Sequence, residues 1–304
     1  MVKTLDRFDL LRLFLKVVET GSLTAAGAAL GLSQPSASRQ LRVLEDDLGA
    51  QLLSRTTHRQ NLTDAGQRFL PEARALVDRW DAVRDDIQDR QADLAGPIRV
   101  LAPVGLGQSV LPEIVGPFLS RHPRISLDWI LDDAPRDLVA EGIDVWLRIG
   151  RVPDESLIVR ELLRIERLVV AGANFPNPAT PETCSELPAV VLTPFANGLV
   201  RLFDRAQREA LIVQETAVAT DNLFTARGFV AAGAGYGVLP RWLVADALDD
   251  GTMRHLVPEW RPAAMPLSIA YPRGRYRPVR IDGFIDMIRS EIAVEADLFR
   301  RSPL

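Results

Sequence analysis

Between Asp64 and Ala92 the sequence predicts a single helix that is too long to be enclosed by one small domain. Apolar side chains recur along it at spacings of four and three residues, as in the a/d seam of a coiled coil: Phe69, Ala73, Leu76, Trp80, Val83 and Ile87. At about 1.5 Å per residue, this helix would extend roughly 45 Å. No compact monomer needs so long an apolar stripe, so we expect it to pair two copies of the chain.

The chain divides on either side of this helix. The turn-forming run Leu94-Ala95-Gly96-Pro97 ends it and indicates a domain boundary. With 304 residues, 47% of them hydrophobic and 25% charged, the chain has the length and composition of two or three globular domains. We predict an N-terminal domain over residues 1–62, a linker helix over 63–94 and a C-terminal domain over 95–304.

The N-terminal segment predicts three short helices followed by a β-hairpin. The first helix spans 8–19 with apolar residues at helical spacing, and the second, over 25–30, is rich in small residues. The third begins with Ser33 as its N-cap and has Pro35 in its first turn, where a missing N–H costs nothing. Apolar and basic residues alternate over 51–62, as in a hairpin or wing. This order indicates an all-α winged helix-turn-helix.

The third helix carries the residues that we expect to contact DNA. Its leucines face the bundle, which leaves polar and basic side chains outside: Gln34, Pro35, Ser36, Ser38, Arg39 and Arg42. Gln can pair with adenine edges, Arg with guanine or phosphate, and Ser with either. The wing offers further contacts to the phosphate backbone or the minor groove: Arg55, Thr57, His58 and Arg59. The alternative is that these are only solvated polar residues. Although the net charge is −4, the local clustering of basic residues predicts a site for double-stranded DNA.

Beyond the boundary the pattern changes to strands alternating with helices. The sequence predicts strands at 98–102, 125–131 and 143–149, separated by helices at 109–120 and 137–141. This order implies parallel strands with crossover helices. Further strands and helices follow as far as a terminal helix over 279–299, which is enough for two small α/β lobes. The stretch 174–188 contains too much proline to predict an element.

Short motifs follow one another in a specific order between Thr20 and Leu70: Ala25-Ala26, Leu32-Ser33-Gln34-Pro35, Ser38-Arg39-Gln40, Leu44-Glu45, Leu48-Gly49, Arg55, Leu62-Thr63 and Ala65-Gly66. In this order they resemble the LysR-type transcriptional regulators. A looser similarity continues through the C-terminal part, at Glu141-Gly142-Ile143-Asp144-Val145 and over 232–240. The resemblance implies a regulator of transcription and not an enzyme.

The same resemblance implies the architecture of the C-terminal domain. It would be similar to a type 2 periplasmic binding protein, with an effector cleft between lobe I, at about 95–166 and 267–304, and lobe II, at about 167–266. The chain would cross between the lobes near 164–169 and 265–270. The resemblance also implies dimers or tetramers on imperfect palindromes in promoter DNA, with RNA polymerase as a further partner.

We expect an unidentified small-molecule effector to be bound at predicted strand ends and adjoining loops. These positions are Pro103, Val104, Gly105, Arg148, Thr193, Phe195 and Asn222. Many relatives have a hydroxyl at the first strand-helix turn that holds an effector carboxylate, whereas this chain has Pro103-Val104-Gly105. This departure argues against a simple carboxylate effector there, although bare N–H groups at the following helix start can still bind an anion.

Other functional classes leave weaker signals. Gly105-Leu106-Gly107 and the glycines over 233–237 lack the spacing of a phosphate-binding loop. Asp132 and Asp133 could suggest a metal, but adjacent residues of a strand point to opposite faces, which favours a solvated loop. Cys184 and the three histidines have no metal-ligand spacing. We therefore predict no catalytic residues, no metal and no cofactor.

Two binding alternatives are weighed against the regulator. The run 271–277 interleaves aromatic and basic residues that could stack on nucleic acid, although a solvated turn is favoured. An exported ligand-binding protein would explain the C-terminal two-thirds. However, the N-terminal apolar stretch is interrupted by charges, and nowhere do 18 apolar residues run together. We therefore expect a cytoplasmic protein that has no membrane partner.

Overall fold

The computed structural model describes residues 6–56, 59–87, 94–193, 199–273, 277–294 and 299. By their contacts the residues group into two compact units. Unit 1 comprises Met1–Leu94, Arg136–Ile143 and Gly274–Asp282, and unit 2 comprises Ala95–Pro135, Asp144–Arg273 and Gly283–Leu304. Each unit has an apolar core of its own.

Unit 1 starts with helices and a hairpin: α1 (Arg7–Thr20), α2 (Leu23–Ala29), α3 (Gln34–Leu48), β1 (Leu53–Thr56), β2 (Arg59–Leu62) and α4 (Asp64–Ile87). Ser33 begins α3 as predicted, because its Oγ accepts a 3.4 Å hydrogen bond from the Ser36 N–H. Gly49 ends α3 in a left-handed conformation with φ of 64°. β1 and β2 are antiparallel, with Leu53 opposite Leu62, which confirms the predicted hairpin.

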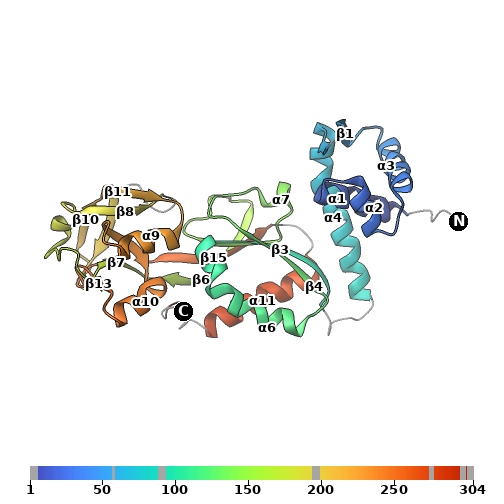
Figure 1. Cartoon of the computed structure of the whole chain (residues 1–304). Coiled ribbons are helices and arrows are strands. Elements are labelled where there is room, and N and C mark those ends of the chain that lie inside the picture. Colours follow the sequence, from blue (N-terminus) through green and yellow to red (C-terminus); the bar gives the residue numbers. More distant parts are fainter. Residues whose placement is uncertain are drawn as a thin grey trace. The chain divides into compact units, whose positions relative to one another are not determined.

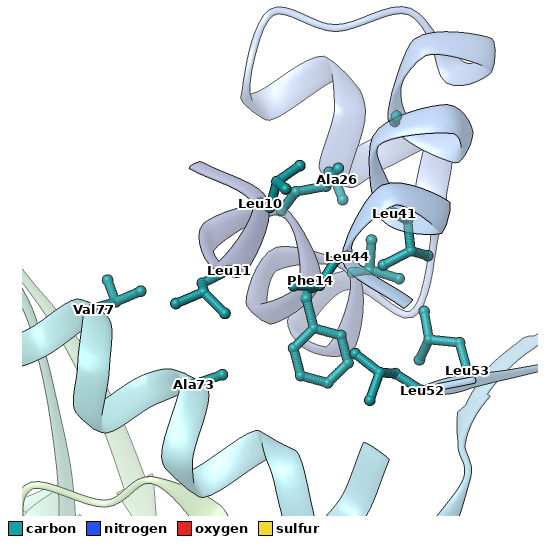
Figure 2. Close-up of a cluster of buried hydrophobic side chains, with 13 residues drawn as sticks. Leu10, Leu11, Phe14, Ala26, Leu41, Leu44, Leu52, Leu53, Ala73 and Val77 are labelled. Atoms are coloured by element: carbon teal, nitrogen blue, oxygen red, sulfur yellow. The ribbon is translucent and has the colours of Figure 1, made fainter. Parts of the chain in front are cut away.

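The helices of unit 1 enclose one apolar core, in which side chains from α1, α2, α3, α4 and the start of the hairpin converge (Figure 2). Figure 2 labels its main members: Leu10, Leu11, Phe14, Ala26, Leu41, Leu44, Leu52, Leu53, Ala73 and Val77. Leu41 and Leu44 turn one side of α3 into this core, as their helical spacing predicted. The polar side of α3 is therefore left facing outward.

The start of α4 packs against the hairpin at a distance that only glycine permits. A Cβ on Gly66 would lie 2.1 Å from the backbone oxygen of Leu52 and 2.9 Å from the Leu62 side chain. Thr63 holds the same junction, because its Oγ1 donates a 2.6 Å hydrogen bond to the Gln51 carbonyl and accepts one of 3.0 Å from the Gly66 N–H. Residue 66 therefore sets how closely α4 approaches the hairpin.

Unit 2 contains a first five-stranded sheet in the order β4-β3-β5-β15-β6. Its strands are β4 (Ile125–Leu131), β3 (Gly96–Ala102), β5 (Val145–Ile149), β15 (Met265–Pro272) and β6 (Leu157–Ile165). β3 is parallel to β4 and β5, as predicted, whereas β15 is antiparallel to β5 and β6. Helices α6 (Val110–Arg121) and α11 (Val279–Val294) lie side by side along this sheet (Figure 1), and the Phe118 and Phe284 rings meet edge to face with centroids 5.6 Å apart.

A second five-stranded sheet has the order β11-β8-β12-β7-β13. Its strands are β11 (Glu215–Thr220), β8 (Pro188–Leu192), β12 (Tyr236–Pro240), β7 (Arg167–Gly172) and β13 (Met253–His255). β8 is parallel to β11 and β12, and β7 is antiparallel to β12 and β13. Helices α9 (Leu223–Ala231) and α10 (Arg241–Asp249) accompany this sheet (Figure 1).

Several shorter elements complete the described chain: α5 (Val104–Gln108), α7 (Leu138–Glu141), α8 (Pro181–Cys184), β9 (Leu199–Phe203), β10 (Glu209–Val213) and β14 (Arg261–Pro262). The three strands form a separate antiparallel sheet in the order β10-β9-β14, which the sequence did not predict. Exposed leucines on β9 and β10 hide the alternation of polar and apolar residues that would have indicated this hairpin.

The chain passes between the two five-stranded sheets at the positions that the resemblance implied. The first passage joins the end of β6 at Ile165 to the start of β7 at Arg167. The second leads from β13 through β14, a strand of the three-stranded sheet, to β15, which begins at Met265. Glu166 links the two, since its carboxylate lies 2.9 Å from the Arg261 guanidinium. Among the described residues, no helix is both long and apolar enough to cross a membrane.

Candidate functional site

α3 presents a polar face with two exposed guanidinium groups. Gln34, Pro35, Arg39 and Arg42 are exposed, and Arg39 and Arg42 have no hydrogen-bond or ion-pair partner in the described part of the chain. Of the two predicted serines, Ser38 is half-buried, and Ser36 is half-buried with its Oγ 2.9 Å from the Ser33 Oγ. This face has positive charge and polar groups in the first turns of a capped helix, an arrangement suited to a DNA groove.

The predicted wing residues are only partly described. Arg55 lies in β1 and Arg59 in β2, where they stand opposite Gln60 and Thr56 respectively. Thr57 and His58 lie outside the described residues. The two strands of the hairpin are therefore described, while contacts from these four side chains to DNA stay a prediction.

The predicted seam of α4 is corrected at its start, because this part of the helix belongs to the core of unit 1. Ala73 has 0% of its surface exposed, and Phe69 packs on Phe14 with ring centroids 5.6 Å apart. Both residues contact their own chain, so Ala73 has no surface left for a second copy. The same apolar spacing serves an intrachain bundle and a coiled coil equally well.

The following turns of α4 leave apolar surface exposed. Leu76, Trp80 and Val83 have 49%, 45% and 39% of their surface exposed, and they follow one another at spacings of four and three residues. One face of Trp80 stacks on Phe8 of α1, with ring centroids 4.7 Å apart and an angle of 15° between the planes. The side chain of Ile87, the last predicted seam residue, is not among those described.

Two charged side chains occupy the edge of the first sheet where β4 and β5 end. Asp133 follows β4, and its Oδ1 accepts a 3.3 Å hydrogen bond from the Val104 N–H at the start of α5. Arg148 donates to the backbone oxygen of Asp133, and its guanidinium carbon lies 5.2 Å from the centre of the Trp146 ring. Burial raises the pKa of Asp133 and lowers the pKa of Arg148, in opposition to the attraction between the two charges.

These contacts correct the predicted anion site at the start of α5. The Val104 N–H already faces a carboxylate of the protein, so an anion entering there would meet negative charge. Pro103 and Gly105 are buried, and a Cβ on Gly105 would lie 2.7 Å from the Leu223 side chain at the start of α9. Their burial argues against direct contact with an effector. Gly105 instead permits close packing between α5 and α9.

The predicted effector residues of the second sheet hold backbone groups of their own chain. Thr193 donates a 3.3 Å hydrogen bond to the Thr220 carbonyl. Asn222 caps α9, because its Oδ1 accepts a 3.0 Å hydrogen bond from the Thr225 N–H. Phe195 lies outside the described residues. Contact between these residues and an effector stays a prediction.

A pocket of about 390 Å³ adjoins these strand ends. Its lining is mostly aliphatic and comes from both five-stranded sheets, from the β9–β10 hairpin and from the start of α9, including Ile149, Leu192, Leu211, Leu223, Val238 and Met265. Of the predicted effector residues that the structure describes, none lines it, although Ile149, Leu192 and Leu223 are the sequence neighbours of Arg148, Thr193 and Asn222. The volume falls within the ~300–1,000 Å³ of typical small-molecule sites.

The remaining candidate chemistry is weak. Cys184 is fully buried, and burial raises the pKa of its thiol to about 11, which keeps it protonated and unreactive. The described residues contain no group of three or more His, Cys, Asp or Glu side chains suited to a metal. Tyr271 is buried and Arg277 is paired with Asp282 at 2.6 Å, so these two ends of the run 271–277 offer no stacking surface for nucleic acid. Residues 274–276 of the run lie outside the described residues.

Two family models match the chain. Residues 8–67 match the model described as "Bacterial regulatory helix-turn-helix protein, lysR family". Residues 91–293 match the model described as "LysR substrate binding domain". The two matches correspond to the segment that contains α1–α3 and the hairpin, and to the segment that contains the two five-stranded sheets.

Full-length relatives and solved structures agree with these models. The HTH-type transcriptional regulator PtxR of Pseudomonas aeruginosa is 32% identical over 304 aligned residues that cover 97% of each chain. The structure of the Vibrio cholerae virulence activator AphB matches with a TM-score of 0.58, 23% identity and coverage of 94% of this chain and 99% of AphB. A full-length OxyR variant from Pseudomonas aeruginosa matches with a TM-score of 0.70, 19% identity and 96% coverage of both chains. At these identities the solved structures show a shared fold.

Proposed function

The chain belongs to the LysR family of transcriptional regulators, which bind DNA, respond to small-molecule effectors and form oligomers, and we propose how its residues divide these tasks. The exposed face of α3 reads promoter DNA, α4 pairs two chains, and a ligand held between the two five-stranded sheets changes the relative orientation of paired chains. The protein acts in the cytoplasm, where it meets promoter DNA and RNA polymerase.

The unpaired guanidinium groups of Arg39 and Arg42 carry the DNA-binding part of this proposal. Two exposed cations without a partner in the described chain repel each other and gain most from a polyanion. A base contact by Arg39 to guanine would give specificity, while a phosphate contact by Arg42 would give affinity and position. Gln34, Pro35 and Ser38 stand on the same face, and Arg55, Thr57, His58 and Arg59 of the hairpin region supply backbone contacts.

Pairing through α4 places two copies of α3 on one duplex. Leu76, Trp80 and Val83 supply the apolar contact between chains, because they stay exposed after unit 1 has formed its core. A pair of chains related by two-fold symmetry recognises two half-sites in inverted orientation. The DNA target is therefore an imperfect palindrome.

Selection from a random DNA pool by the full-length protein tests this function. We expect the enriched sequences to share one inverted repeat whose half-sites lie one helical turn or a multiple of it apart. A variant in which Arg39 and Arg42 are both replaced by Gln should enrich no motif from the same pool. Enrichment of no common sequence by the unaltered protein would contradict the proposal, and so would an unchanged motif with the double variant.

A further inference from the structure

The aliphatic pocket of about 390 Å³ contains charge of one sign only. Among the described residues that line it, the charged ones are Arg167 and Arg201, and there is no Asp or Glu. Most of the lining is apolar, so charge introduced there is poorly screened by water. The charge of a ligand therefore affects the free energy of binding in this pocket more than it would on an open surface.

Arg167 is the cation whose charge is not balanced. It begins β7, and its Nη2 and Nε donate hydrogen bonds of 2.7 Å and 3.2 Å to the Ala263 carbonyl, which is a neutral acceptor. In the described part of the chain no carboxylate lies within ion-pair distance of Arg167. The carboxylate of its neighbour Glu166 pairs instead with Arg261 and Arg241. Burial lowers the pKa of Arg167. A guanidinium in this position would be stabilised by an anion entering the pocket.

Arg201 stands in a different environment. Its Nε lies 3.6 Å from the Glu209 Oε1 on the neighbouring strand, and its side chain is 71% exposed. Its charge is already compensated by a carboxylate and by water. We therefore assign Arg201 to the rim of the pocket and Arg167 to its interior.

Gln214 adds a buried polar group to the pocket. It lies between β10 and β11 with only 8% of its surface exposed, and within the described part of the chain its Oε1 has no hydrogen-bond partner. A buried acceptor without a partner destabilises the site, and a hydrogen-bond donor on a ligand would remove this penalty. Among the lining residues, Gln214 is the one that a hydroxyl or N–H group of a ligand would satisfy.

The other candidate position for an anion, at the start of α5, is already occupied by a carboxylate of the protein. Asp133 accepts the Val104 N–H at the start of α5, so a carboxylate ligand would be repelled there. The acid group of a ligand is therefore directed away from the strand end and toward Arg167. This is a different position from the one that the sequence suggested.

We propose that this pocket binds a small amphipathic monoanion, with its apolar body against Leu192, Leu223 and Val238 and its acid group on Arg167. A hydroxyl or N–H on the body of the ligand donates to Gln214. The identification of this ligand as the effector rests on the proposed function, whereas its binding does not.

Calorimetric titration of the full-length protein with matched acids and alcohols tests the proposal. The probes are octanoate against octanol, and phenylpropanoate against phenylpropanol, with octylammonium as the cation of the same length. We expect at least one acid to bind tenfold or more tightly than its alcohol, which corresponds to about 1.4 kcal/mol, and the cation to bind most weakly. Alcohols that bind as tightly as their acids, or no saturable binding of any probe at millimolar concentration, would overturn it.

Variants of Arg167 and Gln214 locate the site. Arg167→Gln should abolish the preference for the acid and leave binding of the alcohol unchanged, while Arg167→Lys should keep part of the preference because it keeps the charge. Arg160→Gln, an exposed arginine of β6 outside the pocket, is the matched control and should behave as the unaltered protein. A preference that survives Arg167→Gln in a folded protein overturns the assignment.

Gln214→Leu should weaken binding of hydroxyoctanoate several-fold and leave binding of octanoate unaffected. An equal effect on both acids would show that Gln214 is not part of the site.

These titrations contain no DNA, so they test ligand binding separately from the proposed reading of DNA. If the protein binds the acids through Arg167 but selects no DNA motif, the ligand proposal is supported and the proposed DNA reading is contradicted. If it selects a motif but binds none of the acids, the proposed DNA reading is supported and the ligand proposal is contradicted.

Discussion

The rings of Phe8 and Trp80 stack with centroids 4.7 Å apart and planes inclined by 15°, and this contact ties the outer side of α4 to α1. It accounts for one face of Trp80, while 45% of the residue stays exposed. The position of the exposed stripe on α4 is therefore set by the bundle that reads DNA. A change at Trp80 would disturb both the bundle and the stripe, so the proposed contact between chains is tested better at Leu76 and Val83.

Leu76→Glu combined with Val83→Glu should convert dimers into monomers. Both side chains are exposed, and neither takes part in the ring stacking that joins Trp80 to α1. Charges at these two positions should therefore leave the fold of unit 1 intact and destabilise the apolar contact between chains. Light scattering at several protein concentrations measures the effect. Val294→Glu, another exposed apolar position, serves as the control. Dimers that persist in the double variant would refute pairing through this stripe.

Gly66→Ala should destabilise the protein, although alanine favours helix over glycine. The added methyl would overlap the Leu52 carbonyl at 2.1 Å, so α4 must shift away from the hairpin. We expect a loss of roughly 1–3 kcal/mol in the free energy of unfolding, measured by denaturant titration. Gly116→Ala, at a helical glycine of α6 with open space around it, should instead stabilise by up to about 1 kcal/mol. Equal effects of the two changes would contradict the close approach of α4.

His255 should make stability fall as the solution is acidified. Burial, together with Arg261 and Arg241, lowers the pKa of this imidazole from its ordinary value of 6.5, and Glu166 opposes them only in part. The unfolded chain therefore binds a proton more readily than the folded one. The contribution of His255 is present above pH 6.5 and is lost as the pH falls toward the lowered folded-state pKa.

His255→Gln should flatten this dependence. Thermal unfolding at pH 8 and at pH 5.5 should show a smaller difference between the two conditions in the variant than in the unaltered protein. Replacement of His122, whose ring packs beside Phe118, controls for general effects of losing a histidine. An identical pH dependence in all three proteins would argue that His255 titrates equally in the folded and unfolded chain.

The sequence predicted best those features that depend on local spacing and capping. Ser33 begins α3 as predicted, and Leu41 and Leu44 face the core because a helical period fixes which residues share a side. The parallel pairing of β3 with β4 and β5 followed from the order of strands and helices. None of these required knowledge of contacts between distant segments.

The sequence could not choose among residues at a strand end. It pointed to Arg148 and Thr193, whereas their neighbours Ile149 and Leu192 line the pocket. Adjacent residues of a strand face opposite sides, so an error of one position exchanges the pocket for the opposite side. The pocket is also lined by residues of the β9–β10 hairpin, which the sequence pattern did not reveal. Similarly, spacing alone could not assign Ala73 to its own core or to a partner.

The role of α3 is tested most directly by comparing Arg39→Ala with the unaltered protein on its selected DNA and on a scrambled duplex over a range of salt concentrations. If Arg39 reads a base, the variant should lose about 1–3 kcal/mol on the selected sequence and much less on the scrambled one. Arg160→Ala should change neither affinity. Equal affinity of the unaltered protein for both duplexes at every salt concentration would contradict sequence reading by α3.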